Sequence, residues 1–232
     1  MALRQIKAVK NYIQHAEGSC LFSMGNTTVL CVATIENKLP PFLDRNPANT
    51  QGWVTAEYSL LPRAGKERTP RQKGSGSGRS HEISRLIGRS LRGIVDLEKL
   101  NKKSIIIDCD VITADGGTRT ASINGGYIAL CLALKKLIKN KVLAEWPMKD
   151  YLGAVSIGIV EGKMILDLCA KEDNNAAVDM NVVMTGSGEF VELQGTAEQK
   201  PFNQKDLKRM IDTAGGAIKK IIQIQKKVIG GK

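Results

Sequence analysis

The residues best suited to chemistry on a phosphate group form the stretch Asp115–Ser122, with the sequence DGGTRTAS. Its two adjacent glycines let the backbone approach a ligand without a Cβ in the way. A helix that begins here offers free N–H groups and a partial positive charge, and Arg119 adds a planar set of donors that matches phosphate oxygens. The stretch predicts a phosphate pocket. The alternative is a glycine turn that only joins a strand to a helix.

A second set of candidate residues is acidic. Glu172 and Asp173 precede a short segment, and Asp179 follows that segment at the start of an apolar run. Convergent carboxylates near a phosphate can bind Mg²⁺, and one of them can donate a proton to a leaving oxygen. The alternative is a pair of solvated carboxylates at the ends of a loop. Asp108 and Asp110 share one face of a predicted strand and are further candidates, with a charge-paired structural role as their alternative.

The net charge of +11 is concentrated in two segments. Segments 62–92 and 200–232 each contain nine Lys or Arg residues against two acidic residues. Such concentrated positive charge favours a polyanion, and nucleic acid is the usual one. A solvated surface is the alternative, and it suits the lysine-rich second segment better. The RNA-binding candidates in the first segment are Arg63, Lys66, Arg68, Arg71, Lys73, Arg85, Arg89 and Arg92.

Hydrophobic periodicity and turn signals predict the elements that position these residues. In the first half we expect strands at 20–24, 27–35, 53–61 and 104–112, a polar loop at 62–78, and helices from Ser80 to about 100 and at 124–139. In the second half we expect strands at 152–160, 164–170, 179–185 and 189–194, followed by a helix that Asn203 caps.

Each half therefore gives strands followed by helices. The predicted fold class is α+β, built from duplicated strand-rich halves at about 1–147 and 148–232, without the regular alternation of a doubly wound sheet. We expect one compact domain over 1–232, because no flexible linker separates the halves.

Composition narrows the possible functions. The five cysteines are scattered and the chain has two histidines, so a zinc site is not expected. Thiols inside apolar runs are typical of reduced cysteines in the cytoplasm. No secretory signal is visible in the first ten residues, and no apolar run approaches the ~20 residues that span a bilayer. We expect a cytoplasmic protein with no membrane partner.

Seven stretches in order along the chain carry a resemblance to a known family. They are HAEGS at 15–19, GWVTAEY at 52–58, RLIGRSLR at 85–92, DCDV at 108–111, the Asp115–Ser122 stretch, DMNVVM at 179–184 and VELQGTAE at 191–198. The set resembles the ribonuclease PH family of phosphorolytic 3′-to-5′ exoribonucleases over nearly the whole chain. No single stretch is decisive, but the ordered set is highly specific.

The resemblance implies roles for particular residues. Arg79, in the segment GRSHEI at 78–83, binds phosphate together with Gly117, Thr118 and Arg119. Asp173 and Asp179 serve Mg²⁺ binding and acid catalysis. Inorganic phosphate is the co-substrate, and the products are nucleoside diphosphates released from RNA, chiefly at tRNA 3′ ends. The family assembles as a homohexamer, a trimer of dimers, and no DNA substrate is expected.

Two further functions remain open. One is a catalytic subunit of an archaeal exosome, which degrades RNA more broadly in a mixed ring. The other is a non-catalytic RNA-binding ring subunit, which should have lost pocket arginines or aspartates. The chain also lacks the family's Arg-x-Asp-Gly-Arg start and has GSGSG at 74–78 where lysine and glutamine are usual.

Overall fold

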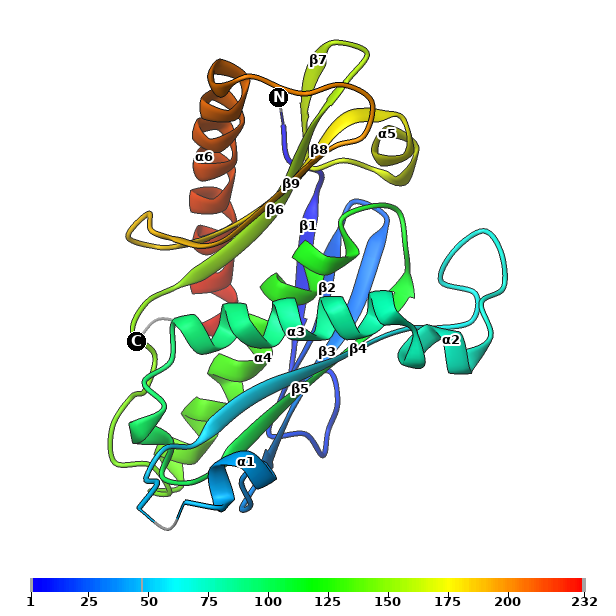
Figure 1. Ribbon diagram of the computed structural model, residues 1–232. Coiled ribbons are helices and arrows are strands. Elements are labelled where there is room, and N and C mark those ends of the chain that lie inside the picture. The colour runs from blue at the N-terminus through cyan, green and yellow to red at the C-terminus, as the bar shows by residue number, and fades with distance from the viewer. Residues whose placement is uncertain (1, 47, 231–232) are drawn as a thin grey trace.

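Two β-sheets and three long helices form the frame of the computed structural model, which describes residues 2–46 and 48–230 (Figure 1). The side chains of residues 73–75 lie outside this description, and with them the prediction for Lys73. The first sheet has the order β1 (Ile6–Lys10), β2 (Gly18–Met24), β3 (Thr27–Glu36), β5 (Ser104–Thr113) and β4 (Trp53–Leu60). The second has the order β7 (Lys163–Leu166), β6 (Leu152–Val160), β8 (Ala176–Thr185) and β9 (Phe190–Ala197). The predicted α+β class is confirmed.

The long helices cover the sheets and join them. Helix α3 (Gly78–Gly93) packs on β4, and α6 (Gln204–Ile229) packs on β6 and β8. Helix α4 (Thr118–Lys139) contacts β2 and β3 of the first sheet and β6 of the second. One cluster of buried apolar side chains therefore includes residues of both sheets. The single-domain organisation over 1–232 stays a prediction.

Helix α4 is long and apolar enough to cross a membrane by length and composition alone. Its apolar window is 78% buried inside the protein, however, because sheet residues and neighbouring helices surround it. Fifteen of its residues are buried, from Thr120 to Leu137. A helix that is apolar on all sides is typical of the centre of a protein core as well as of a membrane span.

The single parallel strand pair positions the glycine turn. Strands β4 and β5 run side by side in parallel, with α3 as part of the connection between them, while the other strand pairs are antiparallel. Both carboxyl ends therefore meet at one edge of the sheet. There the Leu61 N–H donates to the Val111 carbonyl at 3.0 Å, and the Ala114 N–H donates to the Ala64 carbonyl at 2.8 Å. Ligands of open α/β sheets commonly bind at such an edge.

Several predicted boundaries are wrong. The helix predicted from 124 begins at Thr118, directly after the glycine turn. Ser80 does not cap α3; the Ser77 side chain accepts the Ser80 N–H, and the helix ends at Gly93. The expected loop at 62–78 contains the short helix α2 (Arg71–Gly76). The strand predicted at 164–170 ends at Leu166, because the chain turns and enters α5 (Ala170–Asn174).

Other local predictions are confirmed. The Asn203 side chain caps α6 by accepting the Asp206 N–H at 2.9 Å. All five cysteines are free thiols, and four of them are buried. Burial raises the pKa of Cys20 and of Cys131 to about 12, so both thiols stay protonated at neutral pH. Strand β1, the short helix α1 (Pro41–Asp44) and the 3₁₀ turn Glu98–Leu100 were not predicted.

Candidate active site

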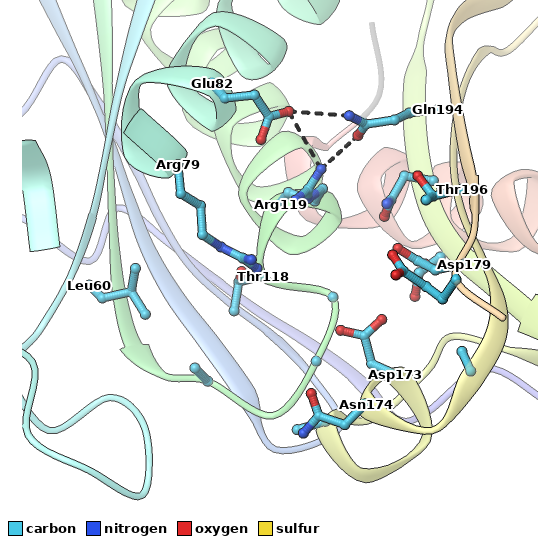
Figure 2. Close-up of a pocket in the computed structure, with 18 of the residues that line it drawn as sticks. Leu60, Arg79, Glu82, Thr118, Arg119, Asp173, Asn174, Asp179, Gln194 and Thr196 are labelled. Carbon is cyan, nitrogen blue, oxygen red and sulfur yellow. Dashed lines mark hydrogen bonds and ion pairs between the residues drawn. The ribbon is translucent and has the colours of Figure 1, made fainter. Parts of the chain in front are cut away.

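A polar cleft of about 630 Å³ lies where the two halves of the fold meet (Figure 2). Helices α3 and α4 line it from the first half, and α5, β8 and β9 line it from the second. All six residues predicted to bind phosphate or to act in catalysis lie in its wall: Arg79, Gly117, Thr118, Arg119, Asp173 and Asp179. Residues that are up to a hundred positions apart in the sequence are thus brought to one site.

The glycine turn forms one wall and has a conformation that favours glycine. Gly116 and Gly117 have φ of +75° and +64°, in the left-handed region. A Cβ on Gly116 would lie 2.3 Å from the Leu168 carbonyl oxygen, so the turn contacts the second half backbone to backbone. Gly117 is the N-cap of α4, and no side chain caps this end. The first N–H groups of α4 therefore remain available for an anion.

The two pocket arginines are held differently. Arg119 donates to the Gln194 side-chain oxygen at 2.6 Å and pairs with Glu82 at 3.5 Å, so its position is fixed from both halves. Arg79 lies in the first turn of α3 and points into the pocket (Figure 2). Within the described part of the chain, Arg79 has no hydrogen-bond or ion-pair partner. The hydroxyls of Tyr58 and Thr118 lie 2.8 Å apart beside them.

Two carboxylates complete the pocket. Asp173 comes from α5 and Asp179 from β8. Burial raises the pKa of Asp179 to about 6, and the neighbouring charge of Asp173 adds to the shift, while Arg119 and Arg79 oppose it. The opposing effects show that the arginines and carboxylates share one electrostatic environment. Such a perturbed acid in a cleft is typical of a functional site.

The carboxylate pair fits the needs of Mg²⁺. Among the residues that the structure describes, no group of three or more His, Cys, Asp or Glu side chains is arranged as a metal site. Mg²⁺ commonly takes only one or two protein carboxylates and completes its shell with water and substrate phosphates. Asp173 and Asp179, beside the wall that is predicted to bind phosphate, supply this donor set. They do not supply the complete protein shell of a structural metal.

The raised pKa of Asp179 predicts a pH-dependent stability. In the folded chain this carboxyl ionises near pH 6, against an ordinary value of 3.8. Its contribution to stability is therefore present at low pH and is lost as pH rises from about 4 to 6. In Mg²⁺-free buffer with chelator, Asp179→Asn should raise the Tm by about 2–5 °C at pH 8. The same substitution should raise the Tm much less at pH 4.5. Calorimetry on both proteins checks this, and an equal change at the two pH values would contradict it.

The predicted RNA-binding residues fall into two groups, and none whose side chain is described lines the cleft. Arg89 pairs with Glu192 at 3.2 Å, and Arg92 stacks 4.3 Å above the Trp53 ring and donates to the Val54 carbonyl. These two side chains therefore have structural partners. Arg89 is nevertheless exposed, as are Arg63, Lys66, Arg68, Arg71 and Arg85, and RNA contact stays a prediction for all of these residues and for Arg92.

Several lining residues were not among the predicted site residues. Gln194 and Thr196 alternate along β9, Glu198 follows directly after the strand, and all three line the pocket. These residues recur at every second position within the stretch 191–198, and this spacing could have identified them as one face from the sequence. Ser156 gave no such signal, because it lies within an apolar strand. Asp108 and Asp110 do not line the pocket. They lie on the face of β5 opposite the buried Cys109 and Val111, and burial raises the pKa of each.

Comparison with known proteins identifies relatives over nearly the whole chain. Residues 2–136 match the model of the 3′ exoribonuclease family, domain 1, and residues 150–217 match that of domain 2. The chain is 52% identical to ribonuclease PH of Moorella thermoacetica, covering 98% of this chain and 91% of the relative. It is also 52% identical to ribonuclease PH of Solibacter usitatus, covering 99% and 96%.

Solved structures share the fold at lower identity. The crystal structure of rice (Oryza sativa) Rrp46 superposes with a TM-score of 0.77 at 17% identity, covering 98% of this chain and 96% of that chain. A chain of the Archaeoglobus fulgidus exosome with RNA bound to the active site gives 0.77 at 22% identity, covering 96% and 89%. Both similarities support the two-sheet architecture.

Proposed function

Because the chain belongs to the 3′ exoribonuclease family, we propose that its cleft removes nucleotides from RNA 3′ ends by phosphorolysis. The observation that carries the proposal is the meeting of Arg79, Arg119, the glycine turn and two carboxylates in one pocket. The two relatives that are 52% identical over nearly the whole chain are both named ribonuclease PH. On this proposal the protein is a phosphate-dependent nucleotidyltransferase of the ribonuclease PH type that trims the 3′ ends of tRNA precursors.

The reaction brings an anionic nucleophile to an anionic diester, so the site must first offset charge repulsion. An oxygen of inorganic phosphate forms a bond to the phosphorus of the last nucleotide. The bond from that phosphorus to the 3′ oxygen of the preceding nucleotide breaks, and this oxygen takes up a proton. The product is a nucleoside diphosphate. Arg79, Arg119 and the free N–H groups of the turn would hold the attacking phosphate in line and stabilise developing charge.

Asp173 and Asp179 would act on the scissile phosphate and on the leaving 3′ oxygen. Their carboxylates would hold Mg²⁺, which when bound offsets negative charge on the scissile phosphate. The pair would also supply the proton for the leaving 3′ oxygen, since a carboxyl group with a raised pKa is a suitable donor. No nucleophilic side chain is needed, because phosphate itself attacks.

RNA binding and assembly extend beyond the cleft. The exposed residues Arg63, Lys66, Arg68, Arg71 and Arg85 would contact the RNA backbone while its unpaired end enters the site. Similarity to exosome chains supports an oligomeric assembly. We further propose that the protein assembles as a homohexamer, built as a trimer of dimers. Its chief substrate would be tRNA 3′ ends, and its location would be the cytoplasm.

The two other functions are less well supported. The exosome chains share the fold at 21–22% identity, far below the 52% of the ribonuclease PH relatives. A non-catalytic ring subunit is disfavoured because Arg79, Arg119, Asp173 and Asp179 are all present and lie together.

The deciding experiment uses the purified chain with Mg²⁺ and an RNA that has an unpaired 3′ tail, with and without inorganic phosphate. We expect nucleoside diphosphates only when phosphate is present. Nucleoside monophosphates without phosphate would instead indicate a hydrolase. Absence of any release would favour a binding subunit or one that needs a second chain, and light scattering on the same sample would report a homohexamer or a monomer.

A further inference from the structure

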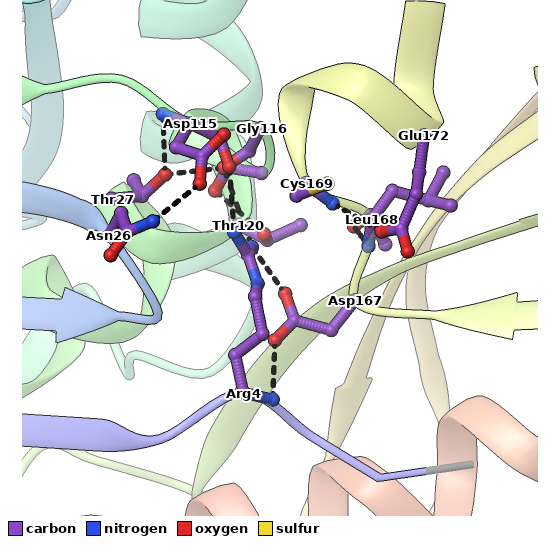
Figure 3. Close-up of polar contacts among 12 residues, drawn as sticks. Arg4, Asn26, Thr27, Asp115, Gly116, Thr120, Asp167, Leu168, Cys169 and Glu172 are labelled. Atoms are coloured by element: carbon purple, nitrogen blue, oxygen red, sulfur yellow. Dashed lines mark hydrogen bonds and ion pairs between the residues drawn. The ribbon is translucent and has the colours of Figure 1, made fainter. Parts of the chain in front are cut away.

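Arg4 reaches into the seam between the glycine turn and the segment that leads to α5 (Figure 3). Its Nη1 donates to the Asp115 carbonyl at 2.7 Å, and its Nη2 donates to Asp167 Oδ1 at 2.6 Å. The Arg4 backbone N–H donates to Asp167 Oδ2 at 3.0 Å. A longer contact of 3.5 Å joins Nη2 to the Gly116 carbonyl. One side chain thus connects the N-terminal segment with both halves of the cleft.

The Arg4–Asp167 pair is largely removed from solvent. The Asp167 side chain is 0% exposed and that of Arg4 is 18% exposed. A buried carboxylate is costly unless its partners satisfy it, and loss of one partner leaves an uncompensated charge. Asp167 also has a φ of +60°, which is uncommon for a residue other than glycine. Its backbone N–H donates to the Ser156 carbonyl at 2.7 Å, so its conformation is fixed from both sides.

The seam itself is tightly packed. The Ala170 N–H, at the start of α5, donates to Asp115 Oδ1 at 3.2 Å. The Thr27 hydroxyl donates to the Gly116 carbonyl at 2.6 Å. A Cβ on Gly116 would lie within 2.3–2.8 Å of backbone atoms of residues 168–170. The phosphate-binding turn and the helix that carries Asp173 are therefore held in direct backbone contact, with Arg4 across one end of that contact.

We propose that Arg4 and Asp167 are positioning residues that fix the distance between the phosphate-binding turn and the catalytic carboxylates. Neither residue lines the cleft. Arg4 contacts Asp115 and Gly116, immediately before Gly117, while Asp167 lies six residues before Asp173. On the proposed mechanism the turn holds the attacking phosphate, while the carboxylates hold Mg²⁺ and supply the proton for the leaving 3′ oxygen. A change in the distance between them would therefore misalign the attacking phosphate and the leaving oxygen. A misplacement of about 1 Å can cost about 10²-fold in rate.

The test rests on the proposed phosphorolysis. It compares the kinetics of Arg4→Gln, Arg4→Lys and Asp167→Asn with those of the wild type, at a temperature well below the Tm of each protein. We expect Arg4→Gln to lower kcat/KM for phosphate by about 30–100-fold. The KM for RNA should change by no more than about twofold, since the RNA-binding candidates lie elsewhere. Arg4→Lys keeps the charge toward Asp167 but cannot reach both carbonyls, so it should recover part of the loss. Lys7→Gln removes one positive charge from exposed strand β1 and should leave both parameters unchanged.

A double variant separates positioning from a general loss of stability. If Arg4 and Asp167 act as one pair, Arg4→Gln with Asp167→Asn should lose no more activity than the worse single variant. The proposal would be overturned if the activity losses of the two single variants multiplied in the double variant. It would also be overturned if Arg4→Gln folded and kept the wild-type kcat and KM for phosphate. If Arg4→Gln does not fold, Arg4→Lys and Asp167→Asn provide the test. Wild-type kinetics in both of these variants would overturn the proposal. Failure of the wild type itself to consume phosphate would instead refute the proposed function.

Discussion

Replacing Asp179 with asparagine is expected to lower kcat for phosphorolysis by about 10²–10⁴-fold. The variant keeps the shape of the side chain but removes the proposed Mg²⁺ ligand and the proposed proton donor. The KM for phosphate should stay unchanged or fall, because the substitution removes a negative charge from a pocket that must hold an anion. Steady-state rates at saturating RNA, with phosphate varied, separate the two parameters.

A matched control is available on strand β5. Asp110 is half-buried, and burial raises its pKa as it does for Asp179, but it does not line the cleft. Asp110→Asn should therefore leave kcat within about twofold of the wild type. If Asp179→Asn retained a comparable kcat, Asp179 would have no part in the chemistry.

The sequence predicted most strands and the position of the glycine turn because these depend on local signals. The hairpin at Gly25-Asn26, the strand at 152–160 and the Asn203 cap each follow from residue type and period over a few positions. The predicted phosphate role of Arg119 rests on its place shortly after two glycines. Arg79 and the aspartates, in contrast, were weak candidates until the family resemblance joined them to the turn.

Tertiary contacts explain what the sequence did not reveal. Helix α4 begins at Thr118 because the turn that precedes it is held by Arg4, Thr27 and the segment 167–170, none of which is close in sequence. Arg85, Arg89 and Arg92 are spaced i, i+4 and i+7, so they share one face of α3, and all three were predicted to bind RNA. Contacts with Glu192 and Trp53, however, give two of these arginines structural partners. Periodicity identifies a shared face but not what packs on that face.

Arg79→Ala should raise the KM for phosphate by about 10²-fold while leaving RNA affinity within about twofold. Arg79 is the pocket arginine without a hydrogen-bond or ion-pair partner in the described structure, so its guanidinium is available for the ligand. Arg119, in contrast, is already held by Gln194 and Glu82. Phosphate titrations at saturating RNA measure the first effect, and binding of RNA in phosphate-free buffer measures the second.

Arg85→Ala provides the opposite control on the same helix. Arg85 is exposed and lies outside the cleft, so its loss should weaken RNA binding and leave the KM for phosphate unchanged. Arg79→Lys adds a finer comparison, because it keeps the charge and loses the planar pair of donors that matches phosphate oxygens. A KM between those of the wild type and Arg79→Ala would show that both charge and geometry contribute. An unchanged phosphate dependence in Arg79→Ala would remove Arg79 from the site and leave Arg119 and the turn amides to bind phosphate alone.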